Sequence, residues 1–525
     1  MDTEDALGAP VTRAGRAVLE PSVWRDPVAW TIATLVFGAY FAISLFRFLT
    51  LQPASWDLGI YTEYVKQLSL LRAPIVDIRG PGFDLLGDHF QIGLAVLAPF
   101  FRLAPSPATL LFFQALATAL SVFPVIAAGS ALLGRPSGRL IGFAYGCSWG
   151  LQQMIDFDFH EIALAVPLLA FSLSALVRGR VRAAAVWALP LVFLKEDQGF
   201  TVAAIGAVLL FNGVIELTSG DPDPESPRPT WRAGSVGWGT LLFCWGLAWS
   251  VLAITVIIPH FNPLHEYYYW KDGGVVGRGG GLGVGSLVVQ TASGWPVKLQ
   301  TVVMLLLPTA FAAVGSPLAL IALPSLALRF ISTNSAYWGT DWHYNATLMP
   351  ILFIAAVQAL AQWRAAAVDP GGRPARLPGF PAFLGDRGGA VAVSARDGLT
   401  RHAPAMMAAI AVALAFQFPL SDLWHGSTYT ISPEVAADNA AIAVVPNGAT
   451  VQTTLNLLAP LAARTDTFWI GNAGNPLTQY IVFDGRNSGY SPPPSDIPSF
   501  IAQLYPKAGY QQIFSRDDVW VFRRT

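Results

Sequence analysis

Long apolar segments recur along the chain, and they constrain its fold more than any other feature. Hydrophobic residues make up 53% of the 525 residues and charged residues only 12%, about half the charged share usual in soluble proteins. In hydrocarbon a segment must satisfy its own backbone hydrogen bonds, so such segments cross a bilayer as helices. The predicted fold is therefore mainly α, a polytopic transmembrane helical bundle with about eleven spans. The candidate spans are 28–50, 107–133, 140–155, 161–177, 183–194, 198–217, 237–258, 298–314, 317–332, 345–363 and 404–420.

The distribution of arginine predicts the orientation of this bundle. The further apolar segment 91–104 is too short to cross easily, and its length suits a re-entrant or interfacial helix. If it does not cross and the N-terminus is cytoplasmic, the basic residues of the cytoplasmic loops are all Arg and satisfy the positive-inside rule. We therefore expect a multi-pass plasma-membrane protein with an extracytoplasmic C-terminus. The arginines concerned are Arg13, Arg16, Arg25, Arg135, Arg139, Arg178, Arg180, Arg182, Arg228, Arg232, Arg364, Arg373, Arg376, Arg387, Arg396 and Arg401.

Composition divides the chain into three parts. Residues 1–27 are predicted to be a cytoplasmic tail, and residues 28–420 the transmembrane part, with outer loops at 51–106 and 259–297. Residues 421–525 are predicted to form a small α/β domain on the outer face. Its predicted strands are 449–453, 467–470, 479–484 and 519–523, and its predicted helices are 455–463 and 497–505. The polar segments 218–236 and 365–403 are interpreted as cytoplasmic linkers.

Polar clusters on the outer side need an explanation, because acids and histidines are costly at membrane depth. From Arg182, at the predicted cytoplasmic interface, thirteen residues of helix rise only about 20 Å towards Lys195, short of the ~30 Å hydrocarbon core. Charged groups there imply a wet cavity or mutual pairing. We expect one polar cavity, open to the outer side, lined by five groups. These are SWDLG at 55–59, GDHF at 87–90, DFDFHE at 156–161, KED at 195–197 and DWHY at 341–344.

Each group also has a structural interpretation. Asp57 or Asp158 could cap a helix, the segment 195–197 could be an internal ion pair, and the histidines could be interfacial aromatics. A functional cavity is favoured for the whole set, because the inner loops carry no comparable clusters. The aromatic run 265–270 is interpreted as an interfacial belt, with sugar stacking as the alternative. The glycine-rich segment 271–285 is interpreted as a mobile loop, and the loop 259–297 that contains it could be a lid over the cavity.

Several motifs resemble those of a known family. SWDLGIYTEYVKQLS, DHF, TLLFFQALATALSVFPV, DFDFHEIALAVPLL, LKEDQGF and WHYNATLMP look like an uncharacterised bacterial family of polytopic membrane proteins, catalogued as a domain of unknown function. This resemblance covers about residues 30–365. The topology, the acidic residue that opens the first outer loop and the outer soluble domain resemble the GT-C superfamily of membrane glycosyltransferases. The resemblance implies a GT-C-like bundle in the bacterial plasma membrane.

The resemblance also implies a chemistry for the cavity. In GT-C enzymes the first-loop carboxylate is the expected general base, here Asp57. The implied donor is a sugar on a polyprenyl phosphate, whose departing phosphate needs stabilising partners. The substrate-binding candidates are His89, Lys195, His343 and Tyr344. The candidates for lining the cavity or holding a hard cation such as Mg²⁺ or Mn²⁺ are Asp158, His160, Glu161, Glu196 and Asp197. Asp57 stands alone in its loop, without the paired acidic motif of some members, so the cation stays an open alternative.

The expected function is thus a membrane glycosyltransferase that transfers a sugar from a lipid carrier, among membrane lipids, to an envelope glycan or glycolipid acceptor. The alternative is a proton-coupled transporter or lipid flippase that uses the buried acid, Lys and His cluster. Hydropathy shows no clear internal repeat or matched pair of broken helices, which disfavours that alternative. A non-catalytic scaffold would leave the outward clusters unexplained. The net charge of −1 gives no indication of nucleic-acid binding.

Overall fold

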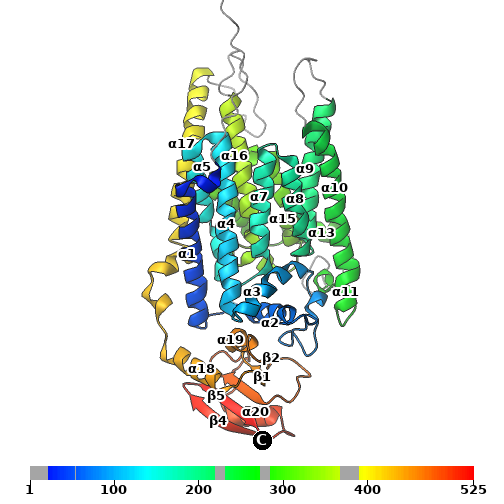
Figure 1. Ribbon diagram of the computed structural model, residues 1–525, viewed down its shortest axis with the longest axis vertical. Coiled ribbons are helices and arrows are strands. Elements are labelled where there is room, and N and C mark those ends of the chain that lie inside the picture. The colour runs from blue at the N-terminus through cyan, green and yellow to red at the C-terminus, as the bar shows by residue number, and fades with distance from the viewer. Residues whose placement is uncertain (1–21, 54, 219–230, 272–283, 367–388) are drawn as a thin grey trace, which may run out of the picture.

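The computed structural model describes residues 22–53, 55–218, 231–271, 284–366 and 389–525. Most of them form helices that run along one long axis, and a small sheet domain covers one end of this bundle (Figure 1). The longer helices of the bundle are α1 (Pro27–Leu49), α4 (Pro107–Leu133), α5 (Arg135–Gly146), α7 (Ala165–Val177), α9 (Gln198–Thr218), α10 (Trp231–Leu252), α14 (Trp295–Leu306), α16 (Leu348–Ala366) and α17 (Gly389–Ala415). The remaining helices are α2 (Asp57–Ser69), which is 13 residues long, and the shorter α3 (Ala98–Leu103), α6 (Trp149–Asp156), α8 (Val181–Ala188), α11 (Ile258–Phe261), α12 (Tyr268–Lys271), α13 (Val284–Ala292) and α15 (Leu323–Phe330).

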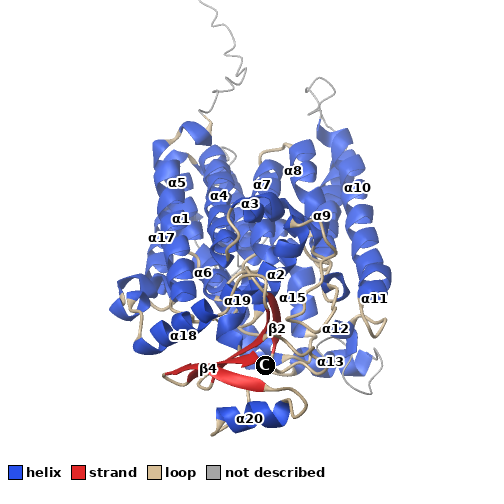
Figure 2. Cartoon of the chain, turned by 60° about the horizontal axis from the view of Figure 1, so that its bottom comes forward, coloured by secondary structure: helices blue, strands red, loops and turns tan. Residues whose placement is uncertain are grey.

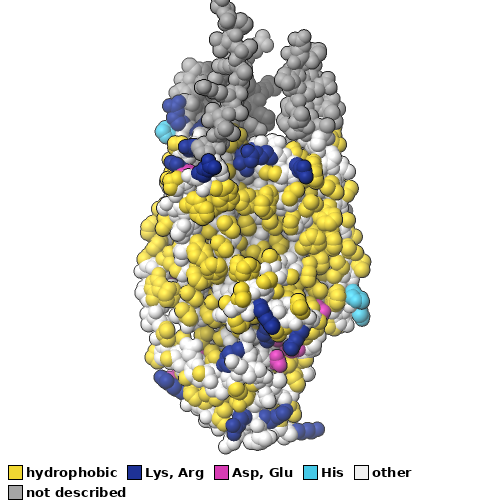
Figure 3. All heavy atoms as spheres, in the orientation of Figure 1, with side chains coloured by type: hydrophobic (Ala, Val, Ile, Leu, Met, Phe, Trp, Pro, Cys, Tyr) yellow, Lys and Arg dark blue, Asp and Glu magenta, His cyan; other side chains and the backbone are white. Residues whose placement is uncertain are grey.

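The surface of the bundle fits a bilayer. A broad band of hydrophobic side chains surrounds its middle, and Lys and Arg gather above and below this band on the face shown in Figure 3. In the described part of the chain, four segments are long and apolar enough to cross a membrane: Pro27–Leu49, Pro107–Leu133, Gly234–Phe261 and His343–Arg364. Shorter apolar helices lie between them. The mainly helical bundle is therefore confirmed, while about eleven crossings and the orientation stay predictions.

Several predicted spans are broken rather than continuous. The segment 140–155 divides into α5 and α6 at Cys147 and Ser148, and α8 passes into a 3-10 turn at Leu189–Phe193 that contains Pro190. Proline lacks the N–H that an α-helix needs, and it clashes with the preceding turn. The predicted interfacial segment 91–104 is likewise a 3-10 turn, Ile92–Leu97, followed by α3, next to α2 at the end of the bundle (Figure 1).

The predicted linkers are only partly supported. Residues 389–403, expected to be part of a linker, instead form the first half of α17, and α10 already begins at Trp231. Alanine and other good helix formers in these stretches explain the difference. Residues 219–230, 367–388 and the 272–283 part of the predicted lid lie outside the described residues.

The C-terminal domain is built on a five-stranded sheet in the order β2-β1-β3-β5-β4. β1 (Thr450–Thr453) pairs in parallel with β2 (Asp466–Trp469) and β3 (Tyr480–Asp484), while β5 (Val519–Arg524) is antiparallel to β3 and β4 (Tyr510–Arg516). The helices are α18 (Pro433–Val444), α19 (Leu458–Ala462) and α20 (Ile497–Leu504). The four predicted strands and both predicted helices are confirmed. β4 was missed because none of its side chains is buried, so it lacks an apolar alternation.

The sheet domain is docked on α2. Figure 2 shows the sheet beneath the helices, and α19 lies between the sheet and the bundle. Leu58, Tyr61 and Tyr64 of α2 share one apolar core with Leu458 and Ala462 of α19.

Polar contacts and a close backbone approach fix this docking. Lys66 Nζ donates to the carbonyl oxygens of Ala462 and Thr465, both at 2.8 Å, at the end of α19. A Cβ atom at Gly59 would lie 3.0 Å from Cβ of Leu458, so the two backbones can approach only because position 59 has no side chain.

We expect Lys66→Met to loosen the C-terminal domain. The two carbonyl oxygens would lose a charged donor, which costs about 1.5–3 kcal/mol. Limited proteolysis of the connection at 425–432 should become faster, whereas Lys507→Met, on the exposed surface of the same domain, should leave it unchanged. Equal cleavage rates for wild type and Lys66→Met would show that the apolar contacts alone hold the domain.

Candidate functional site

A polar cavity of 330 Å³ lies where α2 meets the ends of the bundle helices. Its walls come from α2, from the loop after it, and from the segments around residues 157–162, 195–200, 254–269 and 325–347. The predicted site residues that line it are Asp57, His89, His160, Lys195, Glu196, Asp197, His343 and Tyr344. Residues from all five predicted groups are therefore close in space, although the chain separates them widely.

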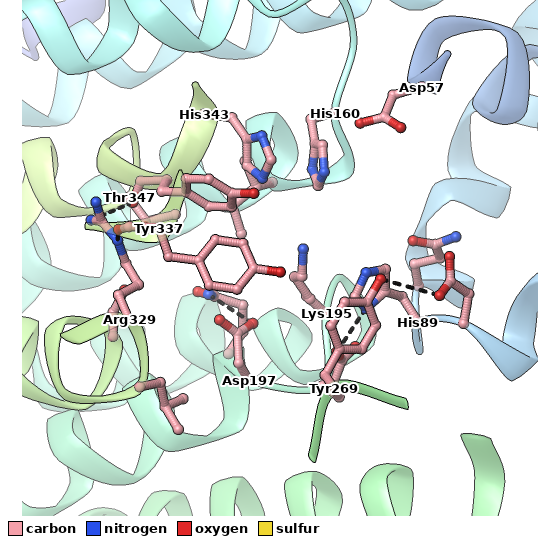
Figure 4. Close-up of a pocket in the computed structure, with 18 of the residues that line it drawn as sticks. Asp57, His89, His160, Lys195, Asp197, Tyr269, Arg329, Tyr337, His343 and Thr347 are labelled. Atoms are coloured by element: carbon pink, nitrogen blue, oxygen red, sulfur yellow. Dashed lines mark hydrogen bonds and ion pairs between the residues drawn. The ribbon is translucent and has the colours of Figure 1, made fainter. Parts of the chain in front are cut away.

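Asp57 is the first residue of α2, and its carboxylate points into the cavity towards His160 (Figure 4). The capping position belongs to Trp56, whose side chain makes no capping hydrogen bond. Burial raises the pKa of the Asp57 carboxyl above its usual range, although nearby His160 and Lys195 favour its charged form. A carboxylate with a raised pKa is a better proton acceptor, as a general base requires.

Glu161 lies behind the cavity wall and is fully buried. Its carboxylate accepts a hydrogen bond from the Tyr61 hydroxyl, and it lies 3.1 Å from Lys195 Nζ and 2.5 Å from His160 Nδ1. A buried charge needs such partners. Glu161 thus holds the lysine and the imidazole that face the cavity.

Glu196 holds a second imidazole in the same way. Its carboxylate lies 2.7 Å from His89 Nδ1 and accepts hydrogen bonds from the Phe90 N–H, at 3.2 Å, and the Tyr267 hydroxyl, at 2.9 Å. Although burial disfavours the charged imidazole, the Glu196 carboxylate raises the pKa of His89. The ring of His89 also stacks on Tyr269, with centroids 4.6 Å apart.

His343 is a buried side chain without a hydrogen-bond partner. Its ring stacks on His160 with centroids 3.5 Å apart. Within the described part of the chain, neither of its ring nitrogens has a hydrogen-bond partner. Buried polar atoms are normally paired, so a nitrogen that lines a cavity in this state suits a polar ligand.

Two acidic residues of the segment 156–161 are not part of the cavity lining. Asp158 is buried and adopts a left-handed backbone conformation, and its carbonyl oxygen accepts a hydrogen bond from Gln114. Asp156 pairs with Arg47 at 2.9 Å. The segment therefore contributes His160 directly and Glu161 indirectly.

Sequence reasoning missed several residues of the site. Tyr267 and Tyr269, interpreted as part of an interfacial belt, instead reach into the cavity, where Tyr269 donates a hydrogen bond to Asp88 at 3.1 Å. Arg79 pairs with Asp88 at 3.2 Å. The alternate tyrosines of the segment 265–270 were a signal for this. The sequence around Arg79 offered none.

Arg329 also lines the cavity, but its donors are used by the backbone around it. It donates to the carbonyl oxygens of Tyr337, Gly339 and Tyr344 and to Asn345 Oδ1, at 2.8 to 3.3 Å. Its main effect is to fold the segment that carries His343 and Tyr344.

The donor set does not form a ready metal site. In the described residues, no group of three or more His, Cys, Asp or Glu side chains is arranged to hold a metal ion. Lys195, whose side chain points into the cavity (Figure 4), lies 3.1 Å from the carboxylate of Glu161, one of the candidate ligands. A requirement for Mg²⁺ or Mn²⁺ stays a prediction, and no step below depends on it.

The helical bundle, the small sheet domain at its end and the polar cavity together define a helical membrane protein with a terminal sheet domain. The fold is similar to that of ArnT from Cupriavidus metallidurans bound to undecaprenyl phosphate, with a TM-score of 0.51 and 14% sequence identity over 96% of this chain and 98% of that chain. The oligosaccharyltransferase of Archaeoglobus fulgidus matches with a TM-score of 0.35 and 11% identity, over 96% of this chain and 75% of that one. No curated protein matches the sequence. The chain belongs to the family of predicted membrane proteins named DUF2079, which matches residues 47–488.

Proposed function

We propose that this protein is a membrane glycosyltransferase that transfers a sugar from a polyprenyl-phosphate carrier to a cell-envelope acceptor on the outer face. The observation that carries the proposal is the convergence of Asp57, Lys195 and two glutamate-held imidazoles in one cavity. The GT-C-like fold agrees with it, and the similar ArnT structure is bound to undecaprenyl phosphate.

The cavity residues have distinct roles in this reaction. The acceptor hydroxyl oxygen attacks the anomeric carbon, and its proton passes to the Asp57 carboxylate. The bond between the anomeric carbon and the phosphate oxygen breaks, and the carrier phosphate leaves with the electron pair. Lys195 and protonated His89 stabilise the negative charge of that phosphate, and the N–H of the His343 ring donates a hydrogen bond to it.

The assay follows the released carrier. Purified protein in lipid nanodiscs, given a panel of polyprenyl-phosphate sugars and envelope glycans, should release polyprenyl phosphate and form a glycosylated product. Solute or lipid movement across sealed vesicles without any product would instead support the transporter or flippase. The clustering of the polar groups at one end of the bundle disfavours that alternative, because alternating access needs a path to both sides.

The rate of transfer should depend on pH through two groups. Asp57 must be ionised, so the rate falls as the pH drops through a pKa that burial has raised above the usual aspartate range. His89 must be protonated, and Glu196 raises its pKa despite burial, so the rate also falls at a pH above the ordinary histidine range. A pH profile of kcat/KM should be bell-shaped, and His89→Gln should remove the alkaline limb. An unchanged alkaline limb in that variant would assign it to another group.

A further inference from the structure

The sheet domain reaches the wall of the polar cavity through the end of β2. This strand forms one edge of the sheet, and it lies near α2 in both Figure 1 and Figure 2. Trp469, the last residue of β2, is half-buried and contacts Trp56 edge-to-face, with ring centroids 5.0 Å apart and ring planes at 82°. Trp56 lines the cavity, whereas Trp469 lies outside the lining. An aromatic side chain of the C-terminal domain thus supports a residue of the cavity wall.

Trp56 is adjacent to two groups of the cavity. It precedes Asp57 in the chain, at the capping position of α2, so a displacement of Trp56 also moves the Asp57 backbone. The guanidinium carbon of Arg79 lies 5.5 Å from the centroid of the Trp56 ring, which is a cation–π contact. Through Trp56, the ring of Trp469 is therefore connected both to the proposed base and to a charged residue of the wall.

Arg79 extends this support to the residues that face the phosphate. It pairs with Asp88 at 3.2 Å, and Asp88 also accepts a hydrogen bond from Tyr269 at 3.1 Å. His89 follows Asp88 in the chain, stacks on Tyr269 and is a proposed partner of the departing phosphate. The contact between Trp56 and Arg79 thus helps to hold the part of the wall that carries His89.

A second contact from the same end of β2 acts on the same loop. Asn472, shortly after Trp469, donates from Nδ2 to the carbonyl oxygen of Ile78 at 2.9 Å and to that of Asp77 at 3.4 Å. These two carbonyl groups lie directly before Arg79 in the chain. A side chain at the end of β2 and another just after it therefore converge on one part of the cavity wall.

We propose that Trp469 of the C-terminal domain is a positioning residue for sugar transfer, which acts through Trp56 to hold Asp57 and the adjoining cavity wall in place. This inference rests on the proposed function, because it assigns Trp469 a role in the same reaction. A displacement of about 1 Å at the reacting groups can cost about 10²-fold in rate, even when its cause is remote from the chemistry. A rigid ring that contacts the residue before the base can prevent such a displacement.

The test removes the ring of Trp469 from the full-length protein in nanodiscs. Trp469→Leu should lower kcat about 10- to 100-fold and leave KM for the lipid donor within about twofold, because Trp469 does not line the cavity. Trp469→Phe keeps an aromatic edge and should restore most of the rate. Gly471→Ala should lower kcat as well, since its Cβ atom would overlap the Trp469 ring and displace it. The matched control is Trp520→Leu, which should transfer sugar like wild type, because Trp520 packs against the separate core of Phe483 and Ile497.

A double variant shows whether Trp469 acts through Trp56. In the Trp56→Leu protein, the added change Trp469→Leu should cause less than about a twofold further loss of kcat, because the two residues form one contact. Additive losses would overturn this route. Faster cleavage of the connection at 425–432 in Trp469→Leu would overturn it too, because undocking of the domain would then explain the slower transfer.

Hydrogen exchange gives a measurement that needs no turnover. The backbone amides of residues 76–89 should exchange faster in Trp469→Leu than in wild type, and Trp520→Leu should leave them unchanged. Unchanged exchange or a wild-type kcat in Trp469→Leu would overturn the inference and leave the proposed function intact. A wild-type protein that releases no carrier from any donor would overturn the proposed function, and exchange at 76–89 would still decide whether Trp469 holds the cavity wall.

Discussion

Replacing Asp57 by asparagine is expected to lower the rate of sugar transfer about 10²- to 10⁴-fold, the range that a positioned general base contributes. Asparagine keeps the size of the side chain but cannot take the proton of the acceptor hydroxyl. Binding of polyprenyl phosphate should stay close to that of wild type, since the proposed role of Asp57 is toward the acceptor hydroxyl and not toward the phosphate. Single-turnover release of the carrier and equilibrium lipid binding measure the two quantities separately.

Glu63→Gln is the matched control for this variant. Glu63 is a buried carboxyl group on the same helix, but it lies outside the cavity lining and accepts a hydrogen bond from the Ile78 N–H at 3.2 Å. Burial raises the pKa of Glu63, so an amide at this position changes the charge little. Glu63→Gln should transfer sugar at the wild-type rate. Transfer by Asp57→Asn at that same rate would remove Asp57 from the mechanism.

Lys195→Met is expected to abolish binding of the carrier phosphate and to destabilise the protein. The substitution removes the ammonium group 3.1 Å from the fully buried Glu161. A buried charge that loses its partner costs about 3–5 kcal/mol. The melting temperature in detergent should therefore fall together with the affinity for undecaprenyl phosphate.

A double variant separates these two effects of Lys195. In Lys195→Met with Glu161→Gln, no buried carboxylate is left without its partner, so the melting temperature should recover most of the loss. Phosphate binding should not recover, because the cavity still lacks its ammonium group. Recovery of binding in the double variant would show that Lys195 has a structural role alone.

The sequence predicted the membrane bundle and the composition of the cavity because both follow from the free-energy cost of placing polar groups in lipid. Long apolar segments must be helices in lipid, and Lys195, Glu196 and Asp197 must be paired or wet if they lie below the surface. In the structure Lys195 pairs with Glu161 while Glu196 pairs with His89. The charged groups of this segment thus pair with distant residues rather than with one another, and they also line the cavity, whose function stays a prediction.

Other features of the site depend on contacts between residues far apart in the chain, which no local sequence pattern shows. The partners of Glu161 come from α2 and from the connection before α9, far away in the chain. Tyr267 and Tyr269 looked like an interfacial belt because an aromatic run has the same composition in a belt and in a cavity wall. Only their hydroxyl contacts with Glu196 and Asp88 show that these two tyrosines belong to the cavity. The docking of Lys66 on α19 joins two segments almost 400 residues apart, as the separation of 396 positions to Ala462 shows.

The helix α2 connects the polar cavity to the C-terminal sheet domain. Asp57 is at the N-terminal end of α2, and Lys66, near the C-terminal end, is hydrogen-bonded to the sheet domain. We therefore expect a tilt of the sheet domain to move α2 and, with it, the Asp57 carboxylate. Cutting the chain before residue 433 would therefore also expose the apolar side of α2 that packs on α19, and we expect the position of Asp57 to become less well defined.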